Sequence, residues 1–102
     1  MIHIVAIITT KEGQRDKLLE AFRTVVPHVL EEKGCIEYTP AIDLETNIPV
    51  QPPIRSNVVT VIEKWEDLPS LEAHLIAPHM VEYRTKVKDL VANTIVCVLE
   101  PA

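Results

Sequence analysis

Three apolar runs decide the fold of this chain: MIHIVAII (Met1–Ile8), NVVTVIEKW (Asn57–Trp65) and NTIVCVLE (Asn93–Glu100). Each has the length of a β-strand, and none alternates cleanly between apolar and polar residues, which is typical of strands buried on both faces. The remaining sequence offers helices for only one face of such a sheet. We therefore expect a second copy of the same sheet to cover the other face, which predicts a homodimer.

The first helix is expected after the turn at Lys11–Gly13. Its apolar residues recur with helical spacing at Leu18, Phe22, Val25 and Val29. Pro27 lies inside this pattern and has no N–H to donate, so we expect a kink or a break there. Gly34 suits the left-handed conformation that commonly follows a helix.

The rest of the chain completes an α+β domain. We expect a strand at Cys35–Leu44, a proline-containing linker at Glu45–Ser56 and the strand at Asn57–Trp65. A helix at Leu68–Ile76, capped by Asp67, should follow. A second helix from Pro78, with Met80, Tyr83 and Val87 in the core, then leads to the final strand. The order is β-α-β-β-α-β with the second helical region broken in two, which predicts a ferredoxin-like fold for residues 1–102 as one domain.

Composition excludes several function classes. The net charge is -5 and the ten Lys and Arg residues are scattered among acids, which argues against nucleic-acid or anionic-membrane binding. No segment approaches the roughly 20 apolar residues of a membrane helix. Cys35 and Cys97 each lie in an apolar run, which favours buried free thiols over a disulfide. We expect a cytoplasmic protein.

Two of the four histidines are candidates for chemistry. Helical rotation places His74 about 90° from the centre of its helix's apolar stripe, at the edge where a cleft would open; a merely exposed histidine is the alternative. His79 begins the next helix about 140° from His74, so the two are not expected to form a metal pair. His3 lies between apolar residues and is expected in the core or an interface, whereas His28 is expected to face solvent.

Three aromatic residues could meet in one cleft. Trp65 ends a predicted strand, Tyr38 lies in another and Tyr83 lies in the last helix. Together they would suit a planar aromatic ligand, and ordinary core filling is the alternative of equal weight.

Four short motifs in this order resemble the antibiotic biosynthesis monooxygenase domain. They are the turn Lys11-Glu-Gly13, G-C-x-x-Y at 34–38, E-x-W-E-D-x-x-x-L-x-x-H at 63–74, and A-P-H at 77–79. The resemblance spans nearly the whole chain. It implies ferredoxin-like homodimers that form a shared α+β barrel, in agreement with the doubly buried strands.

The resemblance also implies an activity. Members similar to this chain oxygenate quinol-like or polyketide-type hydroxylated aromatics with O2 and without metal, flavin or haem. Such chemistry needs an apolar pocket and a base that titrates near neutral pH. His74 is the candidate base, Trp65, Tyr38 and Tyr83 would bind the small aromatic substrate, and His79 would stand at the pocket mouth.

Two other functions are alternatives to this activity. Haem-degrading members of the family use an Asn, a Trp and a His where this chain has Ala6, His74 and Arg84, which argues against haem degradation. A non-catalytic dimeric domain that binds a small molecule or serves a stress response stays open, because fold does not fix function.

Overall fold

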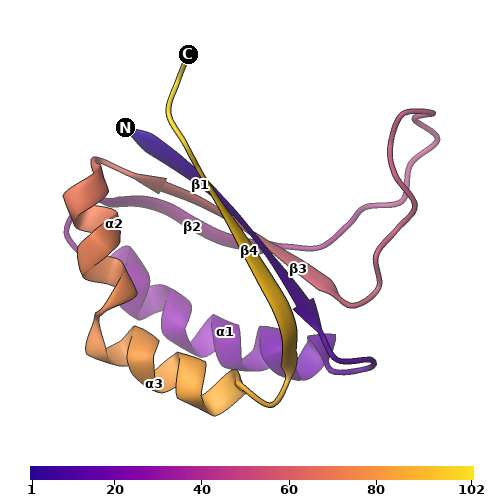
Figure 1. The fold of residues 1–102 in the computed structure, drawn as a ribbon, viewed down its shortest axis with the longest axis horizontal. Coiled ribbons are helices and arrows are strands. Elements are labelled where there is room, and N and C mark those ends of the chain that lie inside the picture. The colour runs from indigo at the N-terminus through magenta and orange to yellow at the C-terminus, as the bar shows by residue number, and fades with distance from the viewer.

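The computed structural model of residues 1–102 contains four strands and three helices. They are β1 (Ile2–Thr10), α1 (Arg15–Leu30), β2 (Cys35–Ala41), β3 (Val58–Trp65), α2 (Leu68–Leu75), α3 (Pro78–Val87) and β4 (Val91–Leu99). The strands form one antiparallel sheet in the order β2-β3-β1-β4, and the helices pack on one face of it (Figure 1). This confirms the ferredoxin-like α+β fold, with α2 and α3 as the divided second helical region. None of the helices has both the length and the apolar character that crossing a membrane requires.

Helix α1 runs through Pro27, so the expected break is wrong. Pro27 and Arg23 are both exposed. The carbonyl of Arg23, which loses its usual donor four residues later, can therefore be hydrated by water, and the buried residues Val25 and Val29 continue the packed stripe across the proline.

Strand β2 ends at Ala41, three residues earlier than expected. Pro40 is tolerated because β2 is an edge strand, which pairs only with β3. The following residues 42–57 form a long loop that projects from the sheet (Figure 1). A two-bond ion pair ties the loop's two arms together, with Arg55 Nε and Nη2 each 2.9 Å from an oxygen of Asp43.

Burial of the strands is one-sided within a single chain. In β1 and β3, fully buried residues alternate with half-buried ones, and β4 is exposed along nearly its whole length. Val59 and Val61, which the apolar pattern places equally on either face, point to the helices and are fully buried. The opposite face, here called the outer face, carries a set of aliphatic side chains together with His3 and Cys97: Val5, Ile7, Ile62, Ile95 and Leu99.

Both cysteines are unpaired. Cys35 lies on β2 and Cys97 on β4, at opposite edges of the sheet. Cys97 is exposed rather than buried, because the strand that carries it has no cover in one chain. Partial burial and two nearby carboxylates raise the pKa of the Cys35 thiol to about 11.

Gly34 joins α1 to β2 in a conformation that other residues rarely adopt. Its φ is +84°, and an added Cβ would lie 2.6 Å from the Cβ of Ser70 and closer still to its Oγ. We expect Gly34→Ala to lower the free energy of unfolding by about 2–4 kcal/mol, from backbone strain and from the clash together.

Gly13 provides a matched control for this substitution. Its φ is +74°, but nothing lies within 4 Å of the position of an added Cβ. Gly13→Ala should therefore cost only the backbone strain, about 1 kcal/mol. Urea unfolding of both variants measures the difference, and equal losses would show that the contact with Ser70 relaxes without cost.

Candidate active site

An apolar cavity of about 390 Å³ opens between the helices and the helix-facing side of the sheet. Eleven of its sixteen lining residues are hydrophobic, and they come from all four strands and all three helices. This volume lies within the range of small-molecule sites, roughly 300–1,000 Å³. The polar side chains that line the cavity include Tyr38, Glu63, His74 and Tyr83.

His74 stands on α2 with its side chain turned inward. Asp67 caps this helix by accepting the N–H of Ser70, as expected from the sequence. The imidazole is packed between two aromatic rings, with centroid distances of 4.7 Å to Trp65 and 5.3 Å to Tyr38. His74 is only 2% exposed, so it is buried more deeply than the edge position that helical rotation predicted.

A carboxylate from another part of the chain holds His74. Its Nδ1 lies 2.9 Å from Oε2 of Glu32, in the segment between α1 and β2. When Nδ1–H donates to this oxygen, Nε2 carries the lone pair and is the nitrogen that can accept a proton. Burial lowers the pKa of His74, and the neighbouring Glu32 partly opposes this shift. The imidazole is therefore neutral, and able to act as a base, at and somewhat below neutral pH.

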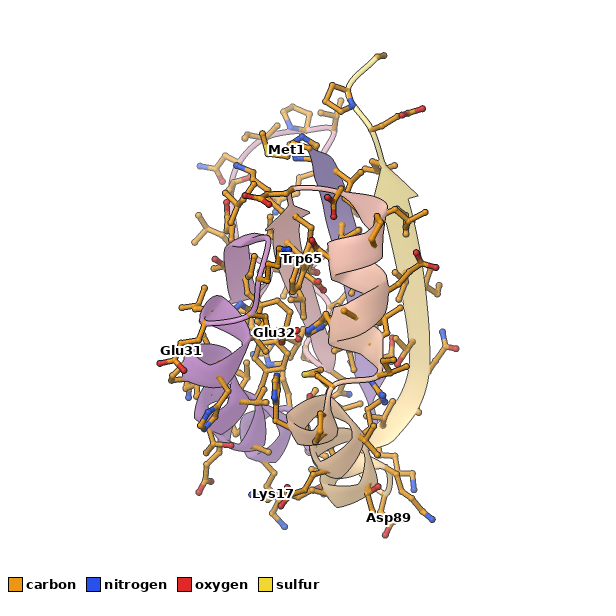
Figure 2. The ribbon with its side chains drawn as sticks, turned by 90° about the vertical axis from the view of Figure 1, so that its left-hand side faces the viewer. Met1, Lys17, Glu31, Glu32, Trp65 and Asp89 are labelled. Atoms are coloured by element: carbon orange, nitrogen blue, oxygen red, sulfur yellow. The ribbon has the colours of Figure 1, made fainter.

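Glu32 also links His74 to the second histidine. Nε2 of His79 lies 2.8 Å from the same Oε2 atom, so one carboxylate oxygen contacts both rings. Figure 2 shows Glu32 between α1 and the later helices. Helical rotation alone predicts that His74 and His79 point in different directions. In the structure, Glu32 joins them, although it lies 42 positions before His74 in the sequence. The arrangement is a hydrogen-bond network, and no group of three or more His, Cys, Asp or Glu side chains could hold a metal ion.

Glu63 is a second buried carboxyl group of the site. It points from β3 to the helix side and is 6% exposed. Its Oε1 accepts the indole N–H of Trp65 at 2.9 Å, and Oε2 has no hydrogen-bond partner in the chain. Burial raises the pKa of Glu63, although the hydrogen bond from Trp65 acts in the opposite direction.

The two tyrosines share the cavity wall with Phe22. The ring of Phe22 stacks on Tyr38 at 5.2 Å and meets the edge of Tyr83 at 5.7 Å. The hydroxyl of Tyr83 is buried without a hydrogen-bond partner, and burial raises its pKa to about 12. Tyr83 therefore stays protonated.

Two expected binding residues lie elsewhere. Trp65 is completely buried behind His74 and does not line the cavity. His79 is half-buried at a separate surface hollow, where its ring lies 6.0 Å from that of exposed His28. The structure places neither residue on the cavity wall: Trp65 contacts His74 and Glu63, and His79 contacts Glu32.

Comparison with known proteins gives concordant results. The family model described as "Antibiotic biosynthesis monooxygenase" matches residues 1–86. The Escherichia coli (strain K12) protein "Probable quinol monooxygenase YgiN" is 38% identical over 103 residues, which cover 99% of this chain and 98% of that protein.

Solved structures share the fold at lower identity. The crystal structure of PA3566 from Pseudomonas aeruginosa has a TM-score of 0.82 at 24% identity, and covers 99% of this chain and 93% of its own. Protein SO0527 from Shewanella oneidensis has a TM-score of 0.77 at 26% identity, with 95% and 86% covered.

Proposed function

The chain belongs to the antibiotic biosynthesis monooxygenase family, and from this premise we propose that it oxidises a quinol-like aromatic with O2, without metal, flavin or haem. One observation carries the proposal: a carboxylate-held histidine stands on the wall of an apolar cavity. The relative named as a quinol monooxygenase, similar over the full length, supports the same substrate class.

The first step that we propose is proton transfer to His74. Nε2 accepts the proton of a substrate hydroxyl, and Glu32 stabilises the imidazolium that forms, through the hydrogen bond to Nδ1. The apolar walls keep water away from the resulting quinolate, so that its charge makes it a good electron donor.

The later steps need no external reductant. The quinolate gives one electron to O2, and the two radicals combine to form a C–O bond at a ring carbon. His74 returns its proton to the peroxide; loss of the C–H proton from that carbon then breaks the O–O bond, and hydroxide leaves as water. One oxygen atom stays in the product, a hydroxyquinone, and the substrate supplies all four electrons that O2 accepts.

We propose that the functional form is a homodimer built on the outer face. Ile62, Ile95 and Leu99 lie on this face with Val5 and Ile7, and no element of the same chain covers them. Burying such a set of aliphatic side chains against a second copy is favourable in proportion to the apolar area removed from water.

Oxygen consumption tests the proposed function. The purified protein is mixed with a small panel of quinols, including 1,4-dihydroxynaphthalene, and O2 uptake is compared with autoxidation in buffer alone. We expect saturable uptake for at least one quinol, at one O2 per quinol. Rates equal to autoxidation across the panel, with tight binding of the same compounds, would favour the non-catalytic binding domain instead.

Glu32→Gln tests two effects of this carboxylate: its stabilisation of the His74 imidazolium and its influence on the pKa of His74. The variant should lose about 10–100-fold in rate, because its amide no longer stabilises the imidazolium, a charge-assisted hydrogen bond being worth about 1.5–3 kcal/mol. Glu32 raises the pKa of His74, so removing its charge should also move the acidic limb of the rate profile to lower pH.

A neighbouring substitution is the control for this prediction. Glu31→Gln removes an exposed carboxylate one residue earlier and should leave both the rate and the profile unchanged. A Glu32→Gln profile whose acidic limb coincides with that of the parent would show that Glu32 does not act on the titrating base.

A further inference from the structure

One buried ionisable group of the cavity has no part in the steps above. Glu63 lies on the sheet wall, whereas His74 lies on the helix wall, and both line the same apolar space. Tyr38 is the cross-strand neighbour of Glu63, and its ring lies 5.3 Å from that of His74. A carboxyl group kept in such surroundings costs folding free energy, so its presence needs a reason outside stability.

The contacts of Glu63 leave one oxygen free. Trp65 is completely buried and donates its indole N–H to Oε1, which fixes the carboxyl plane. Oε2 has no partner in the chain and belongs to a cavity-lining residue. The cavity thus presents a free acceptor oxygen on β3 in addition to the proposed base on α2.

We propose that Oε2 of Glu63 accepts a hydrogen bond from a second substrate hydroxyl, so that the cavity selects aromatics with two hydroxyl groups over those with one. Glu63 is a specificity-determining residue in this account, and His74 deprotonates the other hydroxyl. The inference rests on the proposed function and deepens it, since it states why a quinol is preferred to a simple phenol.

The difference between a hydroxyl and a methyl ether facing Oε2 of Glu63 determines how strongly the cavity prefers the diol. A hydroxyl that donates to a carboxylate gains a charge-assisted bond, whereas a methyl ether at the same place has no hydrogen to donate and leaves Oε2 desolvated and unpaired. We expect the diol to bind about 10–100-fold more tightly than its monomethyl ether.

Binding without turnover tests the inference. Dissociation constants of 1,4-dihydroxynaphthalene and 4-methoxy-1-naphthol are measured under anaerobic conditions by quenching of Trp65 fluorescence, at pH 8. The parent protein should favour the diol by the factor above. Because no O2 is present, the result does not depend on oxygenation; a preference without aerobic O2 uptake would contradict the proposed function alone.

Glu63→Gln then assigns the preference to this residue. With the indole N–H of Trp65 still bound to the amide oxygen, the side chain turns its NH2 group to the cavity, and hydroxyl and ether oxygens can both accept from it. The preference should fall to less than about 3-fold. Glu37→Gln, on the outer side of β2 beside Lys64, is the matched control and should keep the parent's preference.

The variant is expected to fold. Replacing a buried carboxyl whose pKa is raised by burial with a neutral isostere removes a desolvation cost, so urea unfolding should show stability equal to the parent's or greater. Equal affinity of the parent for the two probes, failure of the diol to bind, or a preference retained in Glu63→Gln would each overturn the inference.

Discussion

Replacing His74 with alanine should lower the rate of quinol-dependent O2 uptake by roughly 10²–10⁴-fold, the usual contribution of general acid–base catalysis. The reason is that the other ionisable groups of the cavity wall do not take its place: two are tyrosines that keep their protons, two are cations, and the carboxylate of Glu63 is assigned to the second substrate hydroxyl. Initial rates at saturating quinol, at pH 7, measure the loss.

The rate of the parent protein should fall at acidic pH. Protonated His74 cannot accept the substrate proton, so activity should disappear as the pH falls through its pKa. Burial lowers that pKa, which places the acidic limb below the ordinary value for histidine, about 6.5. In His74→Ala the rate should instead rise toward the pKa of the quinol itself, because solvent then does the ionising.

Stability must be measured beside activity. His74 is buried against Trp65 and Tyr38, so the alanine variant leaves a cavity and will be less stable than the parent protein. His74→Gln keeps more of the volume and serves as the control. Full quinol-dependent uptake at neutral pH in either folded variant would remove His74 from the mechanism.

Placing a lysine at Ile62 should convert the dimer to monomers. Ile62 is at the centre of the outer face, paired with Val5 on β1, whose other neighbour is Cys97 on β4. An unpaired charge buried there costs several kcal/mol, so the dissociation constant should rise by more than about 100-fold. Size-exclusion chromatography with light scattering at micromolar concentration measures the mass.

A second substitution tests whether an added charge disrupts the dimer only when it lies on the outer face. Leu30→Lys places the same charge on a half-exposed aliphatic residue at the end of α1 and should leave the dimer intact. Charges at Val59 or Val61 are less informative, since these side chains face the helices and would disrupt the core of each chain. A parent protein with the mass of one chain, or a dimeric Ile62→Lys variant, would contradict the proposal.

The fold was accessible from the sequence because its signals are local. The spacing of Leu18, Phe22 and Val25 indicated α1, and the structure confirms Asp67 as the cap of α2. Gly34 has the left-handed conformation that was expected, but α1 ends four residues before it, at Leu30. What the sequence could not assign was the face of the sheet to which each strand residue points. Since β3 is apolar at consecutive positions, nothing in it distinguishes the helix side from the outer face.

The same ambiguity explains which site residues were missed. His74 was found because helical periodicity places it near the core, although not how deeply it is buried. Glu63 lay within a recognised motif, but its inward direction depends on the register of β3 against its neighbours. Glu32 meets His74 across 42 positions, and no local pattern records a contact at that separation.

Isotope labelling tests the central claim most directly. Turnover of 1,4-dihydroxynaphthalene under ¹⁸O2, with the product analysed by mass spectrometry, follows each oxygen atom. A cofactor-free monooxygenase with His74 as base predicts one ¹⁸O atom in the hydroxyquinone and one in water, with only the slow autoxidation background in His74→Ala. A quinone without label, accompanied by hydrogen peroxide, would contradict it by showing that the protein merely transfers electrons from the quinol to O2.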